Sequence, residues 1–263
     1  MITSTTQIPK YIRSQIRNNE ITTHTSKLAP GYVQANVVIL PKTAAFDFLL
    51  FCQRNPKPCP VLEVLDEGSY FTKYTADKAD LRYDVPKYRL YEYGEIQEET
   101  NNLEKYWKND FVTFLLGCSF TFDSALMSAG IEIRNVAEGK NVPMFVTNIP
   151  TSTAGIFSGP TVVSMRPIPR DKIVRAVQIT SRFPGVHGSP IQIGESEKIG
   201  IKDVFKPDFG DPTDILADEV PVFWACGVTP QAVAMEAKLP LMITHSPGHM
   251  FVTDLKDEDL SVI

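Results

Sequence analysis

One cysteine-bearing segment occurs twice in this chain, and this repeat constrains the fold more than any other feature. Residues 117–129 read GCSFTFDSALMSA and residues 225–237 read ACGVTPQAVAMEA, so that Cys118 aligns with Cys226. Each copy follows an apolar run and opens a stretch of helical character, which predicts a strand, a short polar turn and a helix. The few matching positions also fit the common sequence pattern of α/β proteins, so a true repeat is one of two interpretations.

The two predicted turns are candidate sites for chemistry. The first turn of a helix offers free backbone N–H groups and a positive dipole end to an anion, and a thiol placed there is expected to ionise readily. Two such turns predict one cleft lined from two sides. The catalytic candidates are Cys118, Cys226 and Asp123, and the predicted substrate-binding residues of the turns are Ser119, Thr121, Gly227 and Thr229. Asp123 and the threonines fit helix capping equally well.

Composition excludes several classes of protein. The chain has 263 residues, a formal net charge of −5 and a pI near 5.5, so it carries no basic footprint for nucleic acid. No apolar stretch approaches the roughly 20 residues of a membrane helix, and the N-terminal residues lack the apolar core of a signal peptide. We therefore expect a cytoplasmic protein with a small-molecule partner. Cys52 and Cys59 are interpreted as packing residues.

The order of the expected elements predicts an α/β fold. Helical and strand-like segments alternate up to about residue 142, including an expected helix at 102–108, which favours a mainly parallel sheet covered on both faces. Residues 143–221 are rich in proline and glycine, with strand-like runs at 161–165, 175–180 and 191–193. We therefore predict a domain formed by residues 1–142 and 222–263 and an inserted β-rich α+β domain at 143–221. The acidic run at 257–259 is expected to be a solvated tail.

Three of the four histidines lie in loops rich in glycine and proline, namely His187, His245 and His249. Such loops carry a large share of functional groups, and imidazole suits proton transfer near neutral pH. Proline and glycine between His245 and His249 break the helix that would place both on one face. No cofactor is therefore predicted, although a divalent metal at the three histidines stays open.

Arg182 precedes His187 by five residues. A guanidinium group in a candidate site loop suggests an acidic substrate, because its planar fork matches a carboxylate. A surface ion pair explains the same residue equally well.

Five segments together resemble one known family, the D-glutamate cyclases, whose bacterial members are labelled hydro-lyases. The likeness extends from about residue 10 to the C-terminus. The segments are APGYVQAN at 29–36, LGCSFTF at 116–122, SRFPGVHGSP at 181–190, FWACGVTPQ at 223–231 and THSPGHM at 244–250.

The resemblance implies a three-layer α/β/α unit built from both chain ends, with a smaller two-layer α+β unit inserted between them. It also implies conversion of D-glutamate to 5-oxo-D-proline and water, an activity that belongs to a larger multidomain relative. Asp123 stands where many relatives are expected to carry glutamate. Aspartate keeps the negative charge, but its side chain is one methylene group shorter than that of glutamate.

The residues suggest a mechanism for such a cyclisation. Arg182 would hold the α-carboxylate, His187 would move protons, and the backbone N–H groups of the two turns would hold the reacting carboxyl. His245 and His249 are further candidates for substrate binding. A racemase or epimerase that uses paired thiols, and a small-acid binding module without turnover, are the alternatives. A homo-oligomer is compatible with the sequence.

Overall fold

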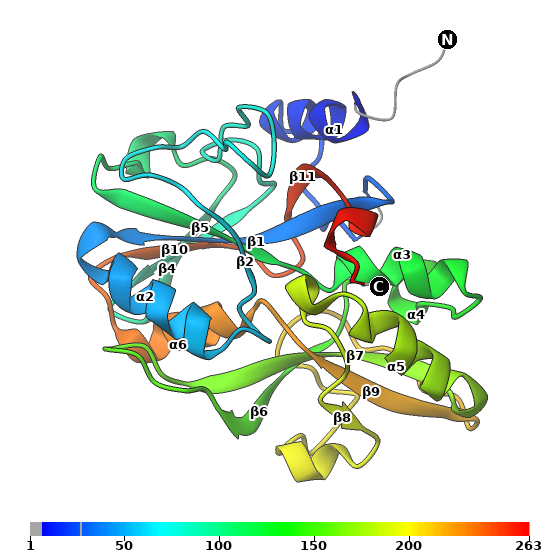
Figure 1. Ribbon diagram of the computed structural model, residues 1–263. Coiled ribbons are helices and arrows are strands. Elements are labelled where there is room, and N and C mark those ends of the chain that lie inside the picture. Colours follow the sequence, from blue (N-terminus) through cyan, green and yellow to red (C-terminus); the bar gives the residue numbers. More distant parts are fainter. Residues whose placement is uncertain (1–6, 27, 263) are drawn as a thin grey trace.

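The computed structural model describes residues 7–26 and 28–262, which form two β-sheets with helices packed between and beside them (Figure 1). In the larger sheet six strands follow the order β2-β5-β1-β10-β3-β4, and β11 pairs with β1. Its strands are β1 (Tyr32–Pro41), β2 (Val61–Val64), β3 (Tyr88–Glu92), β4 (Glu95–Thr100), β5 (Phe111–Gly117), β10 (Met242–His245) and β11 (Phe251–Lys256).

The mixed α/β class is confirmed, but the mainly parallel sheet was a wrong prediction. The strand pairings of the larger sheet are antiparallel. A parallel sheet needs a long crossover between neighbouring strands. Instead, β3 and β4 form a hairpin through Tyr93 and Gly94, both at positive φ, which is the geometry that tight hairpin turns require.

The smaller sheet has the order β6-β7-β9-β8 and is also antiparallel. Its strands are β6 (Met144–Pro150), β7 (Pro160–Pro169), β8 (Gln192–Ile193) and β9 (Glu219–Ala225). Strand β9 pairs with β7 as far as Ala225, so this sheet continues past the boundary expected at residue 221. The division of the chain into two domains stays a prediction.

Two pairs of helices cover inner faces of the sheets. Helices α2 (Lys42–Arg54) and α6 (Thr229–Ala237) pack on the larger sheet, and Figure 1 shows both between the sheets. Helices α3 (Phe120–Ser128) and α5 (Ile173–Ser181) pack on β7 and β9 of the smaller sheet. The strand expected at 175–180 is thus helical. The apolar residues Ile173, Ala176 and Ile179 lie three apart and share one helix face.

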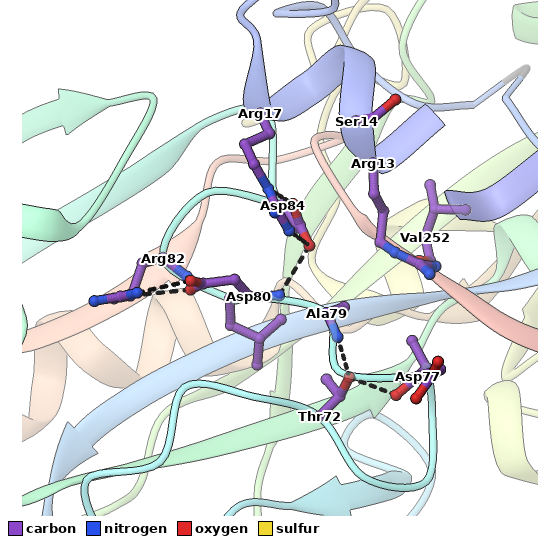
Figure 2. A network of polar contacts seen from close by, with 12 residues as sticks. Arg13, Ser14, Arg17, Thr72, Asp77, Ala79, Asp80, Arg82, Asp84 and Val252 are labelled. Atoms are coloured by element: carbon purple, nitrogen blue, oxygen red, sulfur yellow. Dashed lines mark hydrogen bonds and ion pairs between the residues drawn. The ribbon is translucent and has the colours of Figure 1, made fainter. Parts of the chain in front are cut away.

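The second face of the larger sheet is covered mostly by irregular chain between residues 65 and 107, rather than by the helices that we expected. The helix expected at 102–108 is only the short 3₁₀ turn η1 (Glu104–Tyr106), and α4 (Arg134–Glu138) lies elsewhere, after α3. Helix α1 (Gln7–Arg17) packs against Tyr32 and Val252. An ion pair between Arg17 of α1 and Asp84 links this helix to the irregular chain (Figure 2).

Candidate functional site

Both cysteine segments form the predicted strand, turn and helix. Cys118 directly follows β5, and Cys226 directly follows β9. In each copy the backbone N–H of a threonine donates to the cysteine carbonyl, at 3.2 Å from Thr121 and 3.0 Å from Thr229. The first copy therefore follows a strand of the larger sheet, and the second copy follows a strand of the smaller sheet.

The two turns meet through Asn36 of β1. Its Nδ2 donates to the Gly117 carbonyl at 2.7 Å. On the other side, a Cβ added to Gly227 would lie 1.9 Å from the same Nδ2, so only glycine permits this approach. Cys118 and Cys226 consequently share one buried apolar cluster. Sequence reasoning quoted Asn36 within a motif but assigned it no role.

Both thiols have pKa values above the ordinary range, so they ionise less readily than we expected. Burial raises the pKa of Cys226 to about 11 and raises that of Cys118 as well. Hydrogen bonds from the backbone N–H groups of Phe120 and Val228 lower the pKa of each thiol, as helix starts should, but burial is the larger effect. The expected easy ionisation was therefore wrong. Two N–H groups of each turn are used within the turn, one by the thiol and one by the cysteine carbonyl, and these are not free for a substrate carboxyl.

Arg166 of β7 is the central charged residue of the site, and sequence reasoning missed it. Its guanidinium is fully buried and forms a two-pronged ion pair with Asp123, with Nε to Oδ1 at 2.7 Å and Nη2 to Oδ2 at 2.9 Å. It also donates to the hydroxyls of Ser119 at 3.1 Å and Ser164 at 3.0 Å. An arginine within a strand of valines and prolines was the signal that could have revealed it.

The ion pair sets the electrostatics around the first turn. Burial raises the pKa of the Asp123 carboxyl, and the Arg166 guanidinium opposes that rise. Two such well-aligned hydrogen bonds favour the charged pair. The rings of Phe122 and Trp224 lie 5.2 and 5.6 Å from the guanidinium carbon, so the pair is enclosed by aromatic side chains.

His187 lies against the first turn in a strained backbone conformation. Its φ is +85°, unusual for a residue with a side chain. Its Nδ1 lies 2.7 Å from the Lys57 carbonyl, whereas Nε2 is buried without a hydrogen-bond partner among the described residues. Burial lowers the pKa of His187 to about 4, so the ring is neutral at pH 7. A Cβ on Gly117 would lie 2.1 Å from the Gly185 carbonyl, which explains the glycine there.

The other two histidine candidates lie elsewhere. His245 ends β10, and its Nδ1 lies 3.2 Å from the Val37 nitrogen, where β1 changes partner from β10 to β11. Burial lowers the pKa of His245 to about 3. His249 is half-buried, with Nδ1 3.0 Å from the Pro247 carbonyl. Within residues 7–26 and 28–262, no group of three or more His, Cys, Asp or Glu side chains is arranged to hold a metal ion.

A partly open cavity of about 120 Å³ lies beside the first turn, lined in part by Gln34, Phe120, Asp123 and Ser124. The Gln34 Nε2 donates to the carbonyls of Thr25 and Leu28, both at 2.9 Å. These two bonds fix the orientation of the amide, because the reverse orientation would bring oxygen against oxygen. The buried Oε1 is then left without a partner among the described residues.

A wider groove of about 800 Å³ adjoins this cavity and shares Ser124 with it. Arg175 and Arg182 line the groove, and the Arg182 Nε donates to the Val262 carbonyl at 3.3 Å. The structure therefore places Arg182 at this opening rather than beside the cysteines. The turn residues Gly227 and Thr229 lie on the far side of Asn36, and their role in binding stays a prediction.

The structure is that of a mixed α/β protein with a cavity that is partly lined by polar side chains. A family model described as D-glutamate cyclase matches residues 112–254, and the chain belongs to the D-glutamate cyclase family. No helix among the described residues is long and apolar enough to cross a membrane.

Curated relatives match along nearly the whole chain. A "putative hydro-lyase" of Geobacillus kaustophilus is 61% identical over 254 residues, or 97% of each chain. Proteins with the same description from Thermoanaerobacter sp. and Stutzerimonas stutzeri are 61% and 55% identical and cover 96% and 97% of this chain, and 96% of their own length. A nitrogen repressor-like protein of Methanococcus jannaschii matches with a TM-score of 0.37 and 12% identity, covering 91% of this chain and 96% of its own.

Proposed function

We propose that this chain is a hydro-lyase that converts D-glutamate to 5-oxo-D-proline and water. The observation that carries this proposal is a cavity lined by Gln34, whose buried Oε1 has no hydrogen-bond partner among the described residues, and by Asp123, which is paired with Arg166. Membership of the D-glutamate cyclase family and the names of the relatives support the reaction class.

The distribution of charge matches an amino dicarboxylic acid. The inner wall offers acceptors, the Gln34 oxygen and the Asp123 carboxylate, which suit the substrate ammonium group. The outer groove offers Arg182 and Arg175, which suit its carboxylates. A substrate bound across both would have its amine and side-chain carboxyl confined together. Such confinement can supply on the order of 7–11 kcal/mol of the barrier to ring closure.

Cys118 and His187 lie behind the Asp123–Arg166 pair in this proposal. Both are neutral at pH 7, because burial raises the pKa of the thiol and lowers that of the imidazole. They keep the surroundings of the ion pair dry, which strengthens its electrostatic effect on bound substrate. Proton transfer then falls to a group nearer the groove.

The direct test is an NMR time course of the purified protein with D-glutamate and with L-glutamate, each repeated with a chelator. We expect 5-oxo-D-proline to form from the D isomer at a rate that the chelator leaves unchanged. Replacing Gln34 by Leu removes an acceptor for a charged group, an interaction of about 1.5–3 kcal/mol, so kcat/KM should fall about 10- to 100-fold. No 5-oxoproline above the buffer blank would refute the proposal, and stabilisation by D-glutamate without product would favour a binding module.

The paired thiols favour one alternative, a racemase or epimerase acting on a small acid. Cys118 and Cys226 share one cluster, as a two-thiol mechanism requires. Their raised pKa values oppose it, because one thiol must ionise to accept the α-proton. Deuterium incorporation from solvent at the α-carbon without loss of water would identify this activity.

A further inference from the structure

Asp257 is a buried carboxyl that the roles above leave unused. It begins the 3₁₀ turn η5 (Asp257–Leu260), in the acidic run that we expected to be a solvated tail. Its neighbours Glu258 and Asp259 are exposed, but Asp257 is only 9% exposed because its backbone N–H donates to the Gly31 carbonyl at 3.0 Å. Its side chain lines the groove.

Both carboxyl oxygens of Asp257 are buried, and the Ser124 hydroxyl is the hydrogen-bonding side chain that acts on them. A carboxylate buried in this way is costly unless a ligand or a proton compensates it. The groove wall therefore contains a buried carboxyl that no cation of the described chain pairs with and that the Ser124 hydroxyl contacts.

The charged groups around Asp257 come from three elements. Helix α3 contributes Asp123, which is bound to Arg166. Helix α5 contributes Arg175 to the same groove, as does Arg182, the residue directly after this helix, and neither forms an ion pair with a described residue. From its own segment, Lys256 is paired with Glu258 at 3.3 Å.

These surroundings leave Asp257 able to change its protonation state near neutral pH. Burial raises the pKa of Asp257 to about 7, the Asp123 charge adds to this effect, and the Ser124 hydroxyl opposes it. Asp123 is held by a guanidinium, whereas Asp257 is not. Two carboxyls whose environments differ in this way are suited to different roles in one reaction.

We propose that the Asp257 carboxylate binds the amino group of the substrate and accepts its proton, an assignment that rests on the proposed function. The amine lies between Asp257 and the cavity acceptors, while Arg182 holds a carboxylate. Ser124 lines both the groove and the cavity and so joins the two parts of the site.

The proton balance of the step is complete within the substrate and Asp257. The ammonium group loses two protons as its nitrogen forms the new C–N bond to the side-chain carboxyl carbon. The bond from that carbon to the departing oxygen breaks, and the oxygen leaves as water with both protons. Asp257 relays these protons in turn and ends in its starting state, so no other reactant is needed.

The first experiment measures binding and does not depend on turnover. Thermal stabilisation of the parent protein is compared for D-glutamate and for glutarate, which has the same two carboxyls but no amine. We expect D-glutamate to stabilise the parent more than glutarate, and Asp257→Asn to reduce that difference while leaving the stabilisation by glutarate unchanged. Equal stabilisation by both ligands in the parent would overturn the assignment. The matched control is Glu258→Gln, which removes the same charge one residue away and should behave as the parent.

The second experiment measures turnover against pH. Positioned proton transfer contributes about 10²- to 10⁴-fold, so Asp257→Asn should lose at least 100-fold in kcat, and the fall of the parent's activity below about pH 7 should disappear. Asp257→Glu should keep that acid limb. At pH 8 Asp257→Asn should unfold at the same or a higher temperature than the parent, because it removes an unpaired buried charge. Full activity in Asp257→Asn refutes the role of Asp257, whereas an inactive parent that still prefers D-glutamate to glutarate refutes only the proposed reaction.

Discussion

The two cysteine turns share one backbone design but differ in their surroundings. In the first copy, Asp123 enters the helix and binds the buried Arg166 beside a cavity. In the second copy the aligned position is Gln231, whose Nε2 donates to the His245 carbonyl at 2.8 Å and whose Oε1 accepts from the Tyr91 hydroxyl at 3.4 Å. The first copy thus carries charge beside open space, and the second is neutral and satisfied by its neighbours.

This difference indicates that the repeated strand–turn–helix backbone serves only as a framework. The residues that surround each copy determine its role. The second turn holds the sheets together through Gly227, Asn36 and α6. The first turn presents a carboxylate to a cavity. We therefore expect substitutions at the first turn to affect both stability and turnover, and those at the second turn to affect mainly stability.

The largest effect is expected from breaking the ion pair of the first turn. Arg166→Met leaves the Asp123 carboxyl buried and unpaired, which should lower the free energy of unfolding by about 3–5 kcal/mol. The equivalent change at the second turn, Gln231→Leu, should cost about 1–3 kcal/mol because it removes the buried hydrogen bonds to the His245 carbonyl and from the Tyr91 hydroxyl. Urea denaturation of both variants measures the two losses. The double variant Arg166→Met, Asp123→Leu should recover part of the loss, and equal losses in the two single variants would remove the distinction between the turns.

A pH-dependent loss of stability should follow from His187, next to the first turn. Its pKa is about 4 when folded and 6.5 as the ordinary value, so the unfolded chain takes up the proton first as pH falls. The contribution is therefore complete above pH 6.5 and is lost between pH 6.5 and 4, by about 3 kcal/mol in total. His187→Gln should show a correspondingly shallower fall in urea midpoint over this window. An unchanged slope in that variant would mean that folding does not lower the pKa of His187.

A smaller effect should come from crowding the contact that joins the turns. Gly227→Ala places a Cβ against the Asn36 amide, and such overpacking costs about 1–3 kcal/mol. Asn36→Ala in the same chain should relieve part of this cost. Gly185→Ala is the matched control, because nothing lies within 4 Å of its added Cβ. If thermal unfolding shows the same change for both glycine variants, the close approach at Gly227 is not limiting.

The sequence predicted what depends on local pattern. Both strand–turn–helix segments are present, because apolar runs followed by polar turns specify them locally. The pairing direction of the strands could not be predicted, since it depends on which distant segments meet. Arg166 was missed for the same reason, as its partner Asp123 lies 43 residues away. Asp257 looked like part of a solvated acidic run, and only its contact with Gly31 explains its burial.

The most direct test of this account is a crystal structure of the protein with 5-oxo-D-proline. We predict that the product lies in the cavity beside the first turn, with its lactam N–H toward the Gln34 oxygen and its carboxylate toward Arg182. Density for the product between the Cys118 and Cys226 sulfurs, or beside Thr229 and His245, would contradict the assignment of chemistry to the first turn alone.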